Sequence, residues 1–282
     1  MMIEMFKRKG QDYKIKERII ITLGDLVNAS EKGRSHIKAL SDIQYAMTAY
    51  INYIAKLPNP KAKEINGGIR YAIETIGKTS HIDRERNIVR SLKEWLKEAS
   101  YYPIRFAILY TIGKLRPVDS ELYRILAEFL NKNLTKSLII PLLWAIGQQG
   151  TRETAVPVPI DYLGESYRKI LDKMEIQDFA MDYEVIRYAV YALWEITMPC
   201  KINPKNCCQD NCRQTVISAL EKKFKTLKDT FDKKSQTEKE KEYPRYLQAG
   251  RFINVVISYL KGDTANISPD DMELLREIRE KN

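Results

Sequence analysis

All four cysteines of the chain lie within thirteen residues, in a segment whose composition is typical of a loop. Thiolates are soft ligands that suit Zn²⁺ or an iron–sulfur cluster, and four of them complete a tetrahedral site. A metal ion bound there would hold together a long loop that has little core of its own. The cluster therefore predicts a structural zinc site formed by Cys200, Cys207, Cys208 and Cys212.

The spacing of these cysteines leaves two alternatives open. Zinc knuckles usually have two to four residues between paired cysteines. Cys208 and Cys212 fit that spacing, but Cys200 and Cys207 are farther apart, and the adjacent Cys207 and Cys208 rarely reach one ion without strain. A disulfide or redox pair is the first alternative, although a cytoplasmic location disfavours it. Free thiols are the second.

A row of basic residues recurs at helical spacing in the segment from Asp83 to Ser100. Positions separated by four, three and four residues share one face of a helix. The row consists of Arg86, Arg90, Lys93 and Lys97, and a second lysine-rich stretch contains Lys222 and Lys225. Such rows bind phosphates or acidic side chains. The alternative is a solvated helix face stabilised by ion pairs four residues apart.

Motifs that would indicate an enzyme are missing from the sequence. It has no phosphate-binding loop, no dinucleotide-binding glycine motif and no nucleophile elbow. With only two histidines, a Ser/His/Asp triad or a histidine-rich metal site is disfavoured. We therefore expect a protein that is not an enzyme. A lyase or DNA glycosylase-like enzyme on the same scaffold is kept as an alternative.

The elements that must position these residues follow an internal repeat. Four apolar segments each end in a small residue, then Ile or Leu, then Gly or Trp: 69–77, 104–113, 140–147 and 186–194. Their last residues are spaced 36, 34 and 47 positions apart, which suits one helix pair per repeat with one insertion. The small residues and glycines predict close helix crossings, and several pairs must stack to cover each apolar face.

Further helices are predicted between and after these segments from the 3.6-residue period. They span residues 37–57, 83–100, 120–130, 162–179, 213–231, 243–260 and 269–280. Three interruptions are expected: irregular loops at 150–160 and 198–212, and a charged, mobile linker at 235–242. No strand is predicted.

The repeat resembles the HEAT family. The best copy has Ile104-Arg105, Ala107, Thr111 and Ile112-Gly113, although Arg116 stands where the family has a glycine. The resemblance implies a right-handed, all-α solenoid of about six antiparallel helix pairs, forming one domain over residues 1–282. It also implies a protein-binding scaffold, because most proteins of this family bind other proteins.

Composition and charge narrow the choice of partner. The chain is 44% hydrophobic and 30% charged, with a formal net charge of +10. No apolar run approaches the roughly 20 residues of a membrane span, and no signal peptide is seen, so a cytoplasmic protein without a membrane partner is expected. The function that these features favour is a regulatory scaffold or adaptor that binds an acidic partner protein. The alternative is a nucleic-acid-binding solenoid that uses the basic row.

Overall fold

The computed structural model describes most of the chain as helices. It describes residues 13–30, 37–54, 62–78, 86–99, 101–117, 119–132, 134–150, 169–170, 182–197, 211–263, 265 and 267–280. Over these residues the structure contains helices and no strand, which confirms the predicted all-α class. The chain divides into two compact units, residues 1–117 and 118–282. The predicted single domain therefore stays a prediction, and each unit is described by itself.

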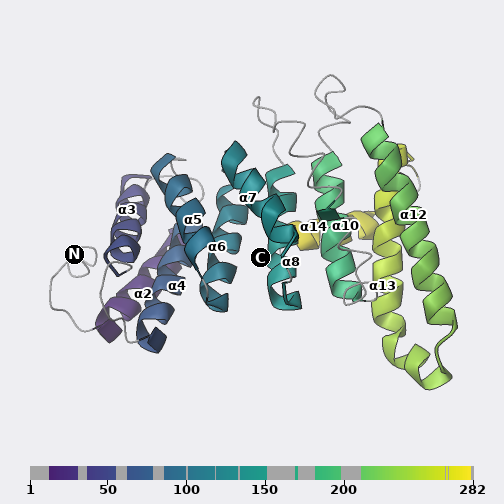
Figure 1. Ribbon diagram of the computed structural model, residues 1–282, viewed down its shortest axis with the longest axis horizontal. Helices are drawn as coiled ribbons and strands as arrows, with labels where there is room; N and C mark the ends of the chain where they lie inside the picture. The colour runs from purple at the N-terminus through teal and green to yellow at the C-terminus, as the bar shows by residue number, and fades with distance from the viewer. Residues whose placement is uncertain are drawn as a thin grey trace. The chain divides into compact units, whose positions relative to one another are not determined.

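The first unit is built around one central helix (Figure 1). Helix α4 packs against α2, α3 and α6, while α5 packs on α6. Its described helices are α2 (Tyr13–Ser30), α3 (Ile37–Ile54), α4 (Ala62–Lys78), α5 (Arg86–Glu98) and α6 (Tyr102–Leu115). The apolar positions that recur along α4 and α6 are its core, including Ile73, Ile76 and Ile108.

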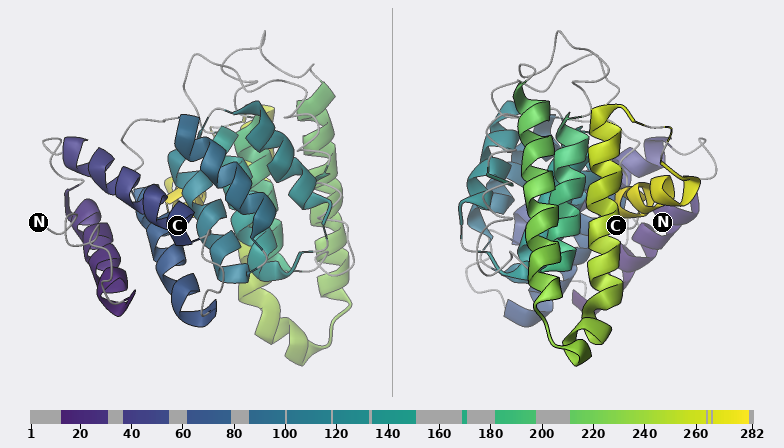
Figure 2. Two further views of the ribbon diagram at one scale, coloured as in Figure 1. Left: turned by 60° about the vertical axis from the view of Figure 1, so that its left-hand side comes forward. Right: turned by 90° about the vertical axis from the view of Figure 1, so that its right-hand side faces the viewer.

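The second unit has a row of packed helices (Figures 1 and 2). Helix α10 packs against α8 and α13, and α13 packs against α12. The shorter α14 crosses α13. The described helices are α7 (Ser120–Leu130), α8 (Lys136–Gly150), α10 (Tyr183–Thr197), α12 (Asn211–Asp232), α13 (Gln236–Lys261) and α14 (Pro269–Glu280).

The predicted close crossings are present in both units. A Cβ atom built on Gly77 of α4 would lie 3.0 Å from Thr111 Oγ1 of α6. One built on Gly147 of α8 would lie 2.6 Å from a ring carbon of Tyr191 and 3.2 Å from the Cα atom of Ala192, both on α10. The Thr111 hydroxyl also donates a buried hydrogen bond to the carbonyl of Ile73 at 2.7 Å. The repeated small residues thus allow neighbouring repeat helices to approach closely.

The predicted linker at 235–242 is wrong, because these residues begin α13. Ser235 caps the helix, and its side chain and that of Glu238 bond reciprocally to each other's backbone N–H groups in a capping box. Gln236 also donates to Glu240 at 3.1 Å, one turn on. Lysine, glutamate and glutamine are good helix formers, so a low apolar content did not prevent a helix here.

The other predicted irregular segments lie mostly outside the described residues. Loop 150–160 is described only at Gly150, the last residue of α8, and loop 198–212 only at its last two residues, which begin α12. The predicted helix 162–179 is described only at 169–170, as helix. The remaining predicted helices agree with α3, α5, α7, α12, α13 and α14 to within a few residues, apart from the earlier start of α13.

Candidate functional site

The cysteine cluster falls almost wholly outside the described residues. Cys200, Cys207 and Cys208 are not described, and Cys212 is described only as backbone in the first turn of α12. Elsewhere in the described part of the chain, no group of three His, Cys, Asp or Glu side chains is placed to hold a metal ion. The zinc site stays a prediction, and elemental analysis of the purified protein tests it.

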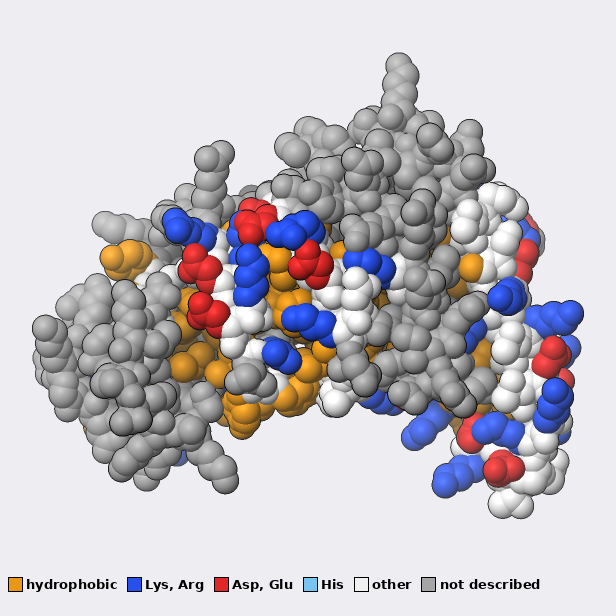
Figure 3. Space-filling model, viewed as in Figure 1, with side chains coloured by type: hydrophobic (Ala, Val, Ile, Leu, Met, Phe, Trp, Pro, Cys, Tyr) orange, Lys and Arg blue, Asp and Glu red, His pale blue; other side chains and the backbone are white. Residues whose placement is uncertain are grey.

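The predicted basic row lies on α5, and its charge is partly compensated. Arg90 donates to Glu94 one turn away at 3.2 Å, and both side chains are exposed. Lys93 and Lys97 also have interaction partners, and only the backbone of Arg86 is described. Figure 3 accordingly shows acidic and basic side chains intermixed over this part of the surface. The structure thus places the row on an exposed helix, with an acidic residue beside it.

The second predicted stretch lies on α12. Lys222 and Lys225 are exposed there, and neither lines a described cavity. Lys222 has an interaction partner of its own. These lysines belong to the second unit, whereas the α5 row belongs to the first.

The sequence did not predict a cavity lined by charged residues of several helices. In the second unit, a cavity of about 790 Å³ lies where α8, α10 and α13 begin and α12 ends. We call it the polar groove. Its lining residues are Lys136, Asp182, Tyr183, Glu184, Arg187, Lys234, Glu238, Lys241, Glu242, Arg245 and Gln248. The sequence shows many charged residues from Lys233 to Arg245. Because 235–242 was interpreted as a linker, these residues were not expected to lie together on one face of a helix.

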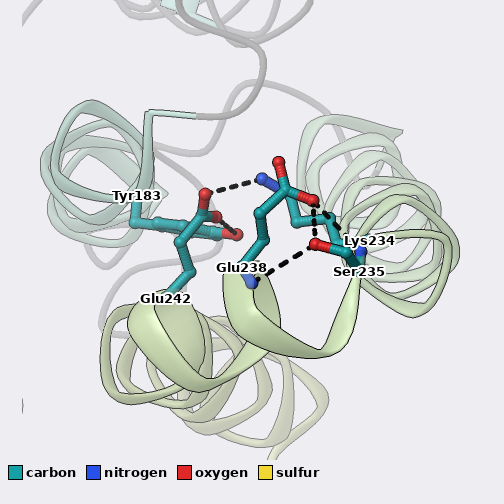
Figure 4. Close-up of polar contacts among 5 residues, drawn as sticks. All are labelled: Tyr183, Lys234, Ser235, Glu238 and Glu242. Atoms are coloured by element: carbon teal, nitrogen blue, oxygen red, sulfur yellow. Dashed lines mark hydrogen bonds and ion pairs between the residues drawn. The ribbon is translucent and has the colours of Figure 1, made fainter.

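Part of the polar groove is lined by a hydrogen-bonded network (Figure 4). The Tyr183 hydroxyl donates to one oxygen of Glu242 at 3.0 Å, and Lys234 Nζ donates to the other at 2.7 Å. The hydrogen bond from Lys234 is the main reason that the pKa of Glu242 lies below its usual value. Burial and the bond to Glu242 raise the pKa of Tyr183. The network ties the start of α13 to α10.

A second ion-pair cluster lies at the start of α10. Lys136 of α8 contacts Asp182 at 3.0 Å and Glu184 at 2.8 Å. Burial alone lowers the pKa of Lys136, but the bonds to Glu184 and Asp182 outweigh it and raise the pKa. Asp182 also accepts bonds from the backbone N–H groups of Glu184 and Val185, at 3.0 and 3.1 Å, as an N-terminal cap of α10. One cation is thus shared by two carboxylates.

Arg187 is a partly buried cation of the groove with no carboxylate bonded to it among the described residues. Its guanidinium lies 5.9 Å from the centre of the Phe252 ring, and its Nη1 donates to the amide oxygen of Gln248 at 3.0 Å. Its Nε is buried and has no hydrogen-bond partner among the described residues. Burial lowers the pKa of Arg187. Among the described residues, this half-buried cation bonds to a neutral amide and faces an aromatic ring, while Glu277 and Glu184 attract it at longer range.

Two further cations, both on α13, line the same groove as Arg187. Lys241 and Arg245 are four residues apart, so they share one side of the helix, and Gln248 follows three residues later. Both are exposed, and within the described residues neither forms an ion pair or a hydrogen bond. The groove's fourth carboxylate, Glu238, is bonded to Ser235. Over all its lining residues, the polar groove has five cations and four carboxylates, a net charge of +1.

A smaller hollow of about 350 Å³ lies on the opposite side of α13. It is lined by Phe224 of α12 and by Leu247, Gly250 and Val255 of α13, with an ion pair between Arg251 and Asp271 at its edge. Leu247 is half exposed, at 50%. This hollow is more apolar than the polar groove, and it brings no titratable cluster together beyond the one pair.

Comparison with protein-family models, curated proteins and solved structures finds no match to this chain. No described helix is both long enough and apolar enough to cross a membrane.

Proposed function

We propose that this chain is a non-enzymatic, cytoplasmic scaffold that binds a partner protein, and that an acidic segment of the partner occupies the polar groove. The proposal includes the finer architecture that the HEAT resemblance implies, a right-handed solenoid of about six helix pairs. The glycine crossings at Gly77 and Gly147 support a repeat of that kind. A solenoid presents extended surfaces that suit a peptide segment.

One observation carries the choice of ligand. Arg187, Lys241 and Arg245 line the polar groove without a carboxylate bonded to any of them in the described structure, while the groove's four carboxylates are each bonded to a neighbour. Cations without a local counterion favour an acidic ligand, because binding brings an opposite charge to a partly desolvated site.

A protein segment suits the groove better than a nucleic acid does. The same cavity contains four carboxylates, which repel a continuous phosphate backbone but leave room for single acidic side chains. The basic row on α5 is interrupted by its ion pair between Arg90 and Glu94. The net charge of +10 still favours some binding of polyanions at low salt.

The test is a titration of the full chain with a fluorescein-labelled peptide of alternating glutamate and glycine, followed by anisotropy. The double substitution Lys241→Glu with Arg245→Glu should weaken binding about tenfold or more, because it puts two negative charges in the groove. Lys222→Glu with Lys225→Glu is the control, since it changes the net charge equally on a surface outside the groove.

The control variant should bind the peptide as the unsubstituted chain does. Equal losses in both double variants would mean that the groove is not the binding site. A labelled single-stranded oligonucleotide provides the second arm. If it binds more tightly than the peptide at physiological salt, and Arg90→Glu abolishes that binding, the chain is a nucleic-acid-binding solenoid instead.

A further inference from the structure

The base of the polar groove is built around a guanidinium whose hydrogen-bonding capacity is only partly used. An arginine has five N–H donors in a planar fork that matches carboxylate and phosphate oxygens. Arg187 donates a hydrogen bond from Nη1 to Gln248, and its Nε is buried without a described partner. The centre of the fully buried Phe252 ring lies 5.9 Å from the guanidinium carbon of Arg187.

The bond to Gln248 also places this fork beside the other two cations. Gln248 lies three residues after Arg245 and seven after Lys241, so all three share one face of α13. Arg187 of α10 thus contacts the face of α13 that also carries Arg245. Positively charged side chains from α10 and α13 therefore line the same cavity.

Among the described residues, the carboxylates of the cavity are not bonded to these cations. Asp182 and Glu184 are bonded to Lys136, and Glu242 is bonded to Lys234 and Tyr183. Glu184 and Glu277 act on Arg187 only through longer-range attraction. The ligand group that would complete the site must supply negative charge and several acceptor oxygens at once.

We propose that Arg187, Lys241 and Arg245 form an oxyanion subsite that accepts a phosphorylated side chain of the partner. This inference rests on the proposed function and names the group that the acidic segment carries. A phosphate monoester has close to two negative charges at neutral pH and three acceptor oxygens. A carboxylate has one charge and two oxygens, so it leaves donors and charge unmatched at a site with three cations.

The experiment compares three labelled peptides that differ only in the central residue of a Gly-Glu-Gly-X-Gly-Glu-Gly sequence, where X is phosphoserine, glutamate or serine. Affinities for the full chain are measured by anisotropy at physiological salt. The phosphoserine peptide should bind about tenfold more tightly than the glutamate peptide, since a phosphate adds charge-assisted hydrogen bonds.

Two variants test the role of Arg187: the first keeps the positive charge at position 187, and the second keeps the arginine. Arg187→Lys keeps the charge but loses the fork, so the preference for phosphoserine should fall to about twofold or less. Gln248→Glu keeps Arg187 but gives it a carboxylate within the protein, so it should lose the preference while raising the melting temperature. Arg124→Lys is the matched control, because Arg124 forms an exposed pair with Glu128 on α7.

The outcomes separate the two proposals. Equal binding of the phosphoserine and glutamate peptides overturns the subsite but leaves the acidic-segment scaffold intact. A preference that survives in both Arg187→Lys and Gln248→Glu also overturns it, since the phosphate would then bind elsewhere. Absence of binding by all three peptides overturns the subsite and the proposed function together.

Discussion

At the residue scale, Gly147 and Gly250 show how the absence of a side chain lets helices pack closely in this fold. Gly147 meets both the Tyr191 ring and the backbone of Ala192, whereas Gly250 of α13 meets only the ring edge of Phe224, at 3.0 Å. A backbone cannot withdraw without moving a whole helix, but a partly exposed ring can rotate away. The two positions should therefore respond differently to the same added methyl group.

We predict that Gly147→Ala destabilises the protein by about 1–3 kcal/mol, because the added Cβ forces α8 and α10 apart. Gly250→Ala should change stability by less than about 1 kcal/mol, since alanine's higher helix propensity offsets a small shift of Phe224. Urea unfolding followed by circular dichroism measures both. Similar losses at the two sites would contradict the close-crossing explanation.

Glu242 makes the stability of the second unit dependent on pH. Its pKa is lowered in the folded state, chiefly by Lys234, so its stabilising contribution is present above the unfolded pKa of about 4.3 and is lost as pH falls through the folded pKa. Glu242→Gln should therefore be less stable than the unsubstituted chain at neutral pH, and the difference should shrink at about pH 3.5.

Glu240→Gln is the control for that measurement. Glu240 lies on the same helix and is exposed, and its side chain accepts a hydrogen bond from the neutral amide of Gln236. Urea unfolding at both pH values should give it a small effect that does not follow the pattern of Glu242. A difference for Glu242→Gln that persists unchanged in acid would rule out its charge as the cause.

At the scale of elements, the start of α13 decides whether the polar groove exists. Gln236–Lys261 is helical from the residue after Ser235, so Lys241, Arg245 and Gln248 are held at fixed positions along one face. Pro244 removes one backbone hydrogen bond within this stretch. The cap at Ser235 and the Glu242 network compensate for that loss.

Removing the cap should therefore weaken this end of the helix. We predict that Ser235→Ala lowers stability by about 1 kcal/mol, because the backbone N–H of Glu238 loses its acceptor and the reciprocal bonds are broken. Thr237→Ala, also in the first turn and exposed, should change stability by only a few tenths of a kcal/mol. Hydrogen exchange of the 236–243 amides would localise the effect, and equal protection in both variants would contradict it.

At the scale of the whole molecule, the excess of basic residues lies in residues 1–117, which have 22 Lys and Arg against 12 Asp and Glu, whereas residues 118–282, which contain the polar groove, have 25 of each. Every groove residue lies in 118–282, and the basic row of α5 lies in 1–117. Net charge alone raises association rates with any acidic ligand. Comparing substitutions of equal charge in the two units therefore separates the effect of local contacts on affinity from the effect of overall charge.

We predict that Arg90→Glu with Lys97→Glu changes the affinity for the glutamate peptide by less than about twofold at physiological salt, while Lys241→Glu with Arg245→Glu changes it about tenfold. Both variants alter the net charge by the same amount. Titrations at two salt concentrations check this. Equal losses would show that overall charge, not the groove, attracts the peptide.

The sequence by itself determined the helical class and most of the helix positions. Apolar residues at a period of 3.6 can bury themselves only as one face of a helix, and repeated small residues such as Gly147 and Ala192 mark where helices meet. These are properties of neighbouring residues along the chain. The same reasoning failed at 235–242, because composition alone does not reveal that Ser235 and Glu238 bond to each other.

Only the tertiary structure decided where the candidate site lies. Lys136, Arg187 and Arg245 come from three helices far apart in the sequence, and no spacing rule links them. Nor does the sequence show which charges are compensated: Lys136 contacts two carboxylates, whereas the described hydrogen-bond partner of Arg187 is the neutral amide of Gln248, although both are single basic residues near acidic ones. Charge compensation depends on distances between side chains of different helices, and folding alone sets those distances.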